Sequence, residues 1–261
     1  MGGDGRAQSP SLSAGGNVAV RRQSAGCGRR LFARGVLGSA EIFDPVTLGW
    51  TPTGSLVNQS FYSTSSATLL MDGRVLAVTG NDAELYDPAT GSWTPTGSLS
   101  YSAYANTATR LGDGTVLVTG GWRTRPDNAS VNNVELYDPT VAAWSLVGNL
   151  HTGRAWHTAT SLPNGHVLVV GGLHFEAGVW SPLKSTELYN PATRTWSLAD
   201  ELGTGRFYHA ETLLRVRRPE RGEFTVLVAG GDDRPDLSSA SNWHTLSSVE
   251  LYSGVPPPIR G

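Results

Sequence analysis

A short motif with fixed turn residues recurs along this chain and constrains its fold more than any other feature. The motif consists of Glu, an aliphatic residue, an aromatic residue, Asp or Asn, and Pro. Four copies are complete and the fifth lacks the turn: Glu41–Pro45, Glu84–Pro88, Glu135–Pro139, Glu187–Pro191 and Glu250–Tyr252. A tryptophan follows each complete copy: Trp50, Trp93, Trp144 and Trp196. Recurrence at roughly 40 to 60 residues predicts a β-propeller or another repeat array.

Residues 156–196 show the expected order of strands within one unit. The stretch 156–162 alternates as a strand requires, and Asn164-Gly165 favours a tight hairpin after it. The apolar run 167–170 then predicts a buried second strand, which ends at a pair of glycines. Residues 185–189 form the third strand, and the Asn-Pro turn leads into a fourth. Each unit is therefore predicted to be a four-stranded antiparallel sheet.

Such a sheet has an apolar face that it cannot cover alone, so neighbouring units are expected to stack. We predict that the repeated aromatic residues pack between units and that the repeated Glu is structural, because these residues occur at the same place in successive units. The aromatic residues concerned are Tyr86, Tyr137, Tyr189, Trp93, Trp144 and Trp196, and the acidic residues are Glu84, Glu135, Glu187 and Glu250.

Composition agrees with an all-β chain and narrows the classes of partner. The 261 residues include 32 Gly, only 16% are charged, and the net charge is −2. A balance so close to neutral gives no reason to expect nucleic acid or a membrane as partner. No signal peptide or membrane-spanning segment is visible, so the default expectation is the cytoplasm. The single Cys27 cannot form an internal disulfide.

These motifs resemble the kelch repeat family of β-propellers. The likeness rests on the Tyr-Asp-Pro turns with their following Trp, on glycine pairs such as Gly171-Gly172, and on the Arg-x-Trp/Tyr-His sequences that begin at Arg154 and Arg206. The resemblance implies a kelch-type propeller at 28–252, between a basic, poorly ordered segment at 1–27 and a Pro-rich tail at 253–261. The predicted units are about 28–55, 56–99, 100–150, 151–202 and 203–252.

The first and last units depart from the family pattern. Gly28–Gly35 fits the second strand of the other units poorly, and Ser253–Pro258 replaces the turn and Trp of the last unit. We therefore expect about four to five blades that form an incomplete or small ring, or a fragment of a larger one, because an open sheet edge is normally covered.

The loops between the second and third strands, together with the connections between units, are expected to emerge on one face. Three of these loops are long and carry aromatic residues that the repeat does not require, beside polar and charged ones. Long loops on a rigid scaffold concentrate binding residues, and Trp and Arg are common anchors of partner recognition. The predicted partner-binding residues are Trp122, Arg123, Arg125, His174, Phe175, Trp180, Asp232, Asp233, Arg234, Trp243 and His244. The alternative is that the aromatic residues fold back as small local cores.

A second set of candidates enters the first strands from the same face. In the two units that have them, Arg and His flank an aromatic residue and are candidates for a polar pocket near the axis, whereas a repeated aromatic residue on its own favours packing. The pocket candidates are Arg154, Trp156, His157, Arg206, Tyr208 and His209. Earlier units keep only the aromatic residue, at Tyr62 and Tyr104, which are the expected counterparts of Trp156.

The function that we predict is a non-catalytic scaffold that binds a protein partner through these loops, without a metal or cofactor. The main alternative is enzymatic, because galactose oxidase and related copper radical oxidases are kelch propellers in which an adjacent Tyr-His pair binds copper, as Tyr208-His209 would here. That chemistry also needs a second Tyr, a second His and a cross-linked Cys. Other kelch proteins act on sugars, so a carbohydrate ligand stays a further alternative.

Overall fold

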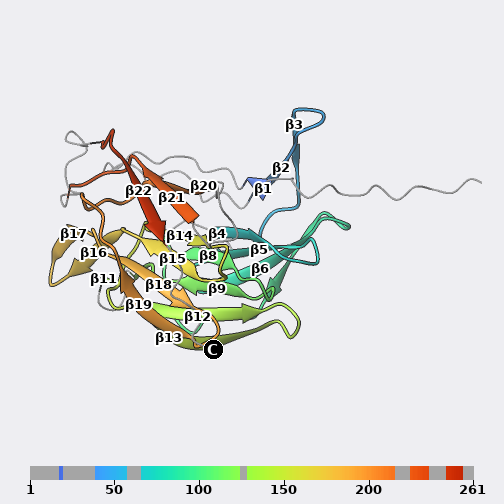
Figure 1. The fold of residues 1–261 in the computed structure, drawn as a ribbon. Coiled ribbons are helices and arrows are strands. Elements are labelled where there is room, and N and C mark those ends of the chain that lie inside the picture. Colours follow the sequence, from blue (N-terminus) through green and yellow to red (C-terminus); the bar gives the residue numbers. More distant parts are fainter. Residues whose placement is uncertain are drawn as a thin grey trace, which may run out of the picture.

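The computed structural model describes residues 18–19, 39–57, 66–123, 128–214, 224–234 and 245–254, and every regular element in these ranges is a β-strand. The strands form antiparallel sheets that succeed one another along the chain (Figure 1). This confirms the all-β fold with four-stranded units that the repeats predict.

Three four-stranded sheets, here called blades, make up the centre of the described chain. We name them blade B, blade C and blade D. Blade B contains β4 (Ser66–Leu69), β5 (Val75–Thr79), β6 (Asp82–Asp87) and β7 (Ser92–Thr96). Blade C contains β8 (Thr107–Arg110), β9 (Val116–Thr119), β12 (Asn133–Asp138) and β13 (Ala143–Asn149). Blade D contains β14 (Thr158–Ser161), β15 (Val167–Val170), β18 (Thr186–Asn190) and β19 (Thr195–Ala199).

The two outer sheets have three described strands each. The first, blade A, contains β1 (Val18–Ala19), β2 (Glu41–Asp44) and β3 (Gly49–Pro52). The last, blade E, contains β20 (Ala210–Leu214), β21 (Phe224–Ala229) and β22 (Val249–Gly254). In Figure 1 the hairpin of β2 and β3 projects away from the other sheets.

The repeated Tyr and Trp meet as cross-strand pairs between the third and fourth strands of each central blade. Their ring centroids are 5.1 Å apart for Tyr86 and Trp93, 4.9 Å for Tyr137 and Trp144, and 5.0 Å for Tyr189 and Trp196. The tyrosines are nearly or fully buried and belong to apolar clusters that extend into the preceding unit. The prediction that these aromatic residues pack between units is confirmed.

The core lies between the blades. The second strand of each central blade is buried on both faces of its sheet. All residues of β5, β9 and β15 are buried. In β21 only alternate residues are buried, because just one face of blade E is covered among the described residues. Val249 and Leu251 on β22 are accordingly 57% and 62% exposed.

The first glycine of the pairs in blades C and D allows the next blade to approach closely. A Cβ on Gly171 would lie 2.6 Å from the Arg206 carbonyl oxygen and 3.1 Å from Cε1 of His209, and Gly120 is crowded in the same way by Arg154 and His157. Both glycines also have positive φ angles, of 56° and 59°. The spacing between blades therefore requires glycine at these positions.

Two of the segments predicted as long loops form small β-hairpins of their own. One pairs β10 (Trp122–Arg123) with β11 (Ala129–Ser130), and the other pairs β16 (Leu173–Glu176) with β17 (Val179–Pro182). β11 and β16 contact each other, and the labels of β11, β16 and β17 lie together on the left side of Figure 1. The two hairpins thus create an additional surface beside the blades.

Several predictions fall outside the described residues. They concern the basic segment at 1–27 apart from β1, the poorly matching stretch 28–35, the tail beyond Gly254, and Cys27.

Candidate functional site

The segment that leads into each of the last three blades pairs with the residues after the glycines of the same blade. Isolated antiparallel bridges join Tyr104 to Trp122, Ala155 to Leu173, and Phe207 to Asp232. The long loops and the connections between blades therefore meet on one face, as the sequence predicted.

We call the segment that leads into a blade its lead-in segment. In each of these three segments, the residue after the bridge residue has a left-handed backbone. The φ angles are 58° at Ala105, 53° at Trp156 and 55° at Tyr208. The Trp156 amide donates to the Ala105 carbonyl and the Tyr208 amide to the Trp156 carbonyl, each at 3.1 Å. This alignment corrects the sequence-based one, in which Tyr104 was the counterpart of Trp156. Tyr104 corresponds to Ala155, because both form the bridge one position earlier.

A left-handed conformation is unfavourable for bulky residues and is concentrated at ligand clamps and other functional positions. Trp156 and Tyr208 adopt it in adjacent blades, and their ring centroids are 5.4 Å apart. The left-handed turn lets each amide reach the preceding blade, but a small residue suffices for that, as Ala105 shows. The large rings at these two positions are therefore an addition to what the fold requires.

Five aromatic rings from two loops and two lead-in segments form one continuous group, here called the aromatic cluster. Its members are Trp122, Trp156, Phe175, Trp180 and Tyr208. The three indoles form a triangle with centroid separations of 5.8, 5.8 and 5.9 Å, and Phe175 lies 4.3 Å from Trp180. The structure thus brings together three of the predicted partner-binding residues and two of the predicted pocket residues.

The cluster is a packed surface and not a cage. Centroid separations below 6 Å are those of rings in direct contact, so no ligand group fits between the indoles. The four inner rings are half-buried, and Tyr208 at the margin is 49% exposed. A ligand would lie across the exposed parts of the rings, which are apolar at Trp122 and Trp156 because the indole nitrogens of these residues are inaccessible to solvent.

The hairpin that carries Phe175 and Trp180 is fixed by hydrogen bonds to its neighbours. Ser130 Oγ accepts the Phe175 amide proton at 3.0 Å and lies 2.9 Å from Nδ1 of His174. The same imidazole nitrogen is 2.7 Å from the Gly153 carbonyl oxygen, which makes it a donor. His174 is therefore a support of the cluster, and Ser130 is a supporting residue that the sequence reading did not select.

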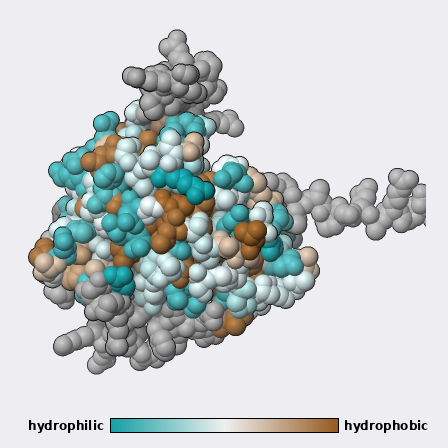
Figure 2. All heavy atoms as spheres, turned by 90° about the horizontal axis from the view of Figure 1, so that it is seen from below, coloured by the Kyte–Doolittle hydropathy of each residue, from teal (hydrophilic) through white to brown (hydrophobic). Residues whose placement is uncertain are grey.

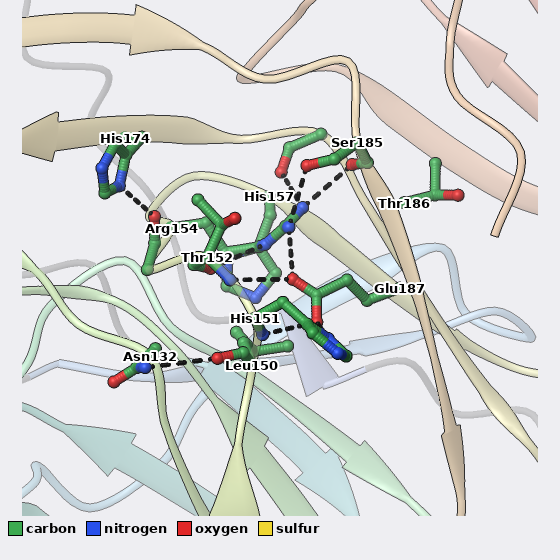
Figure 3. Close-up of polar contacts among 12 residues, drawn as sticks. Asn132, Leu150, His151, Thr152, Arg154, His157, His174, Ser185, Thr186 and Glu187 are labelled. Carbon is green, nitrogen blue, oxygen red and sulfur yellow. Dashed lines mark hydrogen bonds and ion pairs between the residues drawn. The ribbon is translucent and has the colours of Figure 1, made fainter. Parts of the chain in front are cut away.

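Arg154 lies between these loops and the blade core, with its guanidinium fully buried. It donates to Glu187 Oε1 at 2.6 Å and to the Gly171 and Ser185 carbonyl oxygens at 2.9 and 3.0 Å. Figure 3 shows Arg154 and His151 converging on the Glu187 carboxylate. Arg206 repeats the arrangement in blade E with Glu250 and Ser248. Neither arginine is available to line an open pocket, because both are 0% exposed.

The repeated Glu holds the chain where it enters each blade. The carboxylates accept backbone amide protons of Val57, Ser100, His151 and Gly203 at 2.6 to 2.8 Å, one in each of blades B to E. The structural role predicted for Glu84, Glu135, Glu187 and Glu250 is confirmed by these contacts.

The two histidines of the lead-in segments are also enclosed. His157 Nε2 lies 3.1 Å from Thr107 Oγ1 and 3.0 Å from Thr119 Oγ1, and His209 Nε2 lies 2.8 Å from Thr158 Oγ1. Burial lowers the pKa of His209 to about 4 and that of His157 well below its usual range. Both side chains are thereby kept neutral at neutral pH.

The Tyr208-His209 pair does not form a shared ligand set in this structure. The Tyr208 ring packs on Trp156 at the surface, whereas the His209 imidazole binds a threonine between the blades. No group of three or more His, Cys, Asp or Glu suited to a metal ion occurs among the described residues. Among the described residues there is no helix long and apolar enough to span a membrane.

The remaining candidates lie in the third long loop or next to the cluster. Asp232 is buried and accepts the Arg234 amide proton at 2.9 Å, as in an Asx turn. Asp233 and Arg123 are partly exposed, and Arg123 follows Trp122 on β10. Three further candidates, Arg125, Trp243 and His244, lie outside the described residues.

Glu211 is absent from the sequence-based candidates, although the strand pattern contains a signal for it. The first strands Ser66–Leu69, Thr107–Arg110 and Thr158–Ser161 all have Ala at their second position, where the first strand of blade E has Glu.

On the face seen in Figure 2, brown hydrophobic patches are scattered among hydrophilic residues.

Comparison with known proteins identifies the repeats. The family model described as Kelch motif matches residues 103–151 and 157–203. An F-box/kelch-repeat protein of Arabidopsis thaliana is 36% identical over 85 residues, which are 33% of this chain and 17% of that protein. Kelch-like protein 36 of Bos taurus is 27% identical over 129 residues, which are 49% of this chain and 19% of that protein. The matched part thus spans less than a fifth of each relative.

The solved structure of YjhT resembles this chain in fold. The TM-score is 0.52 at 16% sequence identity, and the match covers 66% of this chain and 58% of the other. Identity at this level concerns the fold alone, and it agrees with the succession of four-stranded blades described above.

Proposed function

Since this chain is a kelch-repeat propeller protein, we propose that it is a non-catalytic scaffold that binds a protein partner through its aromatic cluster. The observation that carries the proposal is the convergence of Trp122, Trp156, Phe175, Trp180 and Tyr208 on one face. Aromatic residues on loops above a rigid scaffold are typical anchors of protein interfaces.

The packing of the cluster favours a macromolecular partner. The rings form a solid surface with no gap for a small ligand, and they are held by hairpins that are fixed at Ser130 and His174. A preorganised surface loses little conformational entropy on binding, which favours affinity. The names of the two curated relatives refer to kelch repeats, and each of these proteins is much longer than the matched part.

The test compares proteins captured by the unchanged chain and by variants, after cross-linking and identification by mass spectrometry. Trp180→Ala and Tyr208→Ala remove rings of the cluster. Trp50→Ala is the matched control, because Trp50 is 50% exposed on β3 and takes no part in the cluster. A specific partner should be captured by the unchanged chain and by the control but lost from both cluster variants.

If both cluster variants capture the same partners as the control, the aromatic cluster is not the binding surface and the proposal fails. A glycan array run with the same proteins examines the carbohydrate alternative. Binding of a sugar that depends on Trp180 and Tyr208 would replace the protein partner with a carbohydrate ligand.

A further inference from the structure

Glu211 breaks a pattern that the first strands of the other blades share. The matching positions, fixed by their pairing with the second strand, hold Ala67, Ala108 and Ala159. Ala108 and Ala159 pack against the apolar clusters between blades. Glu211 therefore introduces a carboxyl group at a place where the fold accommodates a methyl group.

The carboxyl group is enclosed between blade E and blade D. Both of its oxygens are inaccessible to solvent, and neither makes a well-formed hydrogen bond to a described residue. The hydroxyls of Thr158 and Thr160 on β14 face it, and Val228 is its cross-strand neighbour on β21. An enclosed carboxylate without a cationic partner is costly, whereas the neutral acid is tolerated far better.

No described cation compensates a charge on Glu211. His209 precedes it by two residues and binds Thr158, while His157 belongs to the lead-in segment of blade D and contacts Thr107 and Thr119. Both imidazoles are kept neutral by burial. Arg154 and Arg206 are each committed to a glutamate of their own blade.

We propose that Glu211 makes the seating of blade E on blade D depend on protonation. With a neutral carboxyl the first strands β20 and β14 pack closely, and loss of the proton loosens this contact. Tyr208 lies three residues before Glu211 and packs on Trp156, so the same event changes the margin of the aromatic cluster. This last step rests on the proposed function, because it regulates the surface assigned to the partner.

The direction of the pH effect follows from the chemistry of a buried acid. Burial raises the pKa of Glu211 from 4.5 to about 7, and the two threonine hydroxyls counteract this only in part. The folded chain then holds the proton more tightly than the unfolded chain does. The stabilisation by the neutral acid is complete below pH 4.5 and is lost as the pH rises through 7.

The experiment measures denaturant unfolding of the full chain between pH 5 and pH 8.5, without any partner. Glu211→Ala restores the residue of the other blades, and Glu211→Gln keeps the shape without the charge. Both variants should be more stable than the unchanged chain at pH 8, by about tenfold or more in the unfolding equilibrium constant. Their advantage should disappear toward pH 5.

A lower stability of Glu211→Ala at pH 8, or a difference that does not change with pH, would overturn the proposal. Tryptophan fluorescence tests the link to the cluster. The emission of the unchanged chain should shift between pH 6 and pH 8, and that of Glu211→Gln should stay constant. A shift that persists in Glu211→Gln would show that other groups cause it. These readouts need no partner, so they can succeed where the proposed function fails.

Discussion

The Tyr208 amide donates to the Trp156 carbonyl at 3.1 Å, and the rings of the two residues lie 5.4 Å apart across the boundary between blades D and E. Backbone and side chains thus connect the blades at the same point. Because both residues have positive φ angles, this connection is made at a conformational cost.

That cost gives an unusual order of stability for small substitutions at Trp156. Ala and Gly both remove the ring, but only Gly adopts a φ of 53° without strain. We expect Trp156→Gly to be more stable than Trp156→Ala by about 0.5–1 kcal/mol, the reverse of the order at an ordinary position. Urea unfolding of the two variants measures this difference.

The matched control is the same pair of substitutions at Trp50, which lies in the extended strand β3. There the Ala variant should be the more stable one. Greater stability of Trp156→Ala than of Trp156→Gly would show that the backbone at 156 is not strained.

The buried ion pair of Arg154 and Glu187 leads to a second prediction, which concerns the loss of stability when the glutamate is removed from blade D or from blade E. Both side chains are fully buried and 2.6 Å apart, so Glu187→Ala leaves an unpaired guanidinium in the core. Removal of one member of such a pair costs about 3–5 kcal/mol. Thermal and urea unfolding of Glu187→Ala should show a loss of this size.

Glu250→Ala is the control, because the Glu250 side chain is 25% exposed and makes the equivalent contact with Arg206. Removal of this partly exposed side chain lets water reach the buried Arg206 guanidinium, so the loss should be clearly smaller than in Glu187→Ala. Equal losses would mean that burial does not determine the strength of these pairs.

The repeats predicted the blades because the same packing contacts recur in successive blades. The Tyr-Asp-Pro turn, the Trp that pairs with the Tyr, and the Glu that binds the incoming chain are determined within one unit and its neighbour. Such local relationships can be derived from spacing and residue type alone. The assignment of Glu187 and its counterparts as structural residues follows for the same reason.

The aromatic cluster could be predicted only as separate candidates. Trp122 and Trp180 are distant in sequence, and their contact depends on hairpins that form within the loops. The loop hairpins follow no repeat, so their direction cannot be derived from residue spacing. The alignment of Tyr104 with Trp156 was wrong by one position, because the left-handed residue has no sequence signature when it is Ala, Trp or Tyr.

The glycine pairs lead to a third prediction. Gly171→Ala places a Cβ 2.6 Å from the Arg206 carbonyl oxygen of the next blade, in addition to the strain of a φ of 56°. We expect a loss of stability well above the cost of about 1–2 kcal/mol for the left-handed backbone alone. Thermal unfolding provides the measurement.

Gly230→Ala is a suitable comparison for this variant. Gly230 has a similar φ of 69°, but among the described residues the nearest atom to its Cβ would be the Leu246 carbonyl oxygen at 3.6 Å. The measured loss of stability in Gly230→Ala should therefore be only the cost of the left-handed backbone. If Gly171→Ala and Gly230→Ala lose the same stability, the close approach of blade E to Gly171 is not maintained in solution.

The buried His209 should make the chain sensitive to acid. Its folded pKa of about 4 lies below the ordinary value of 6.5, so the folded chain binds fewer protons than the unfolded chain in this interval. The stabilisation by neutral His209 is present above pH 6.5 and is lost as the pH falls toward 4. Because Glu211 has the opposite dependence, the measurement belongs in the Glu211→Ala background. There, His209→Gln should make the fall in stability on acidification shallower. An unchanged slope would place the His209 imidazole in water instead of beside Thr158, and the packing of blade E on blade D would need another basis.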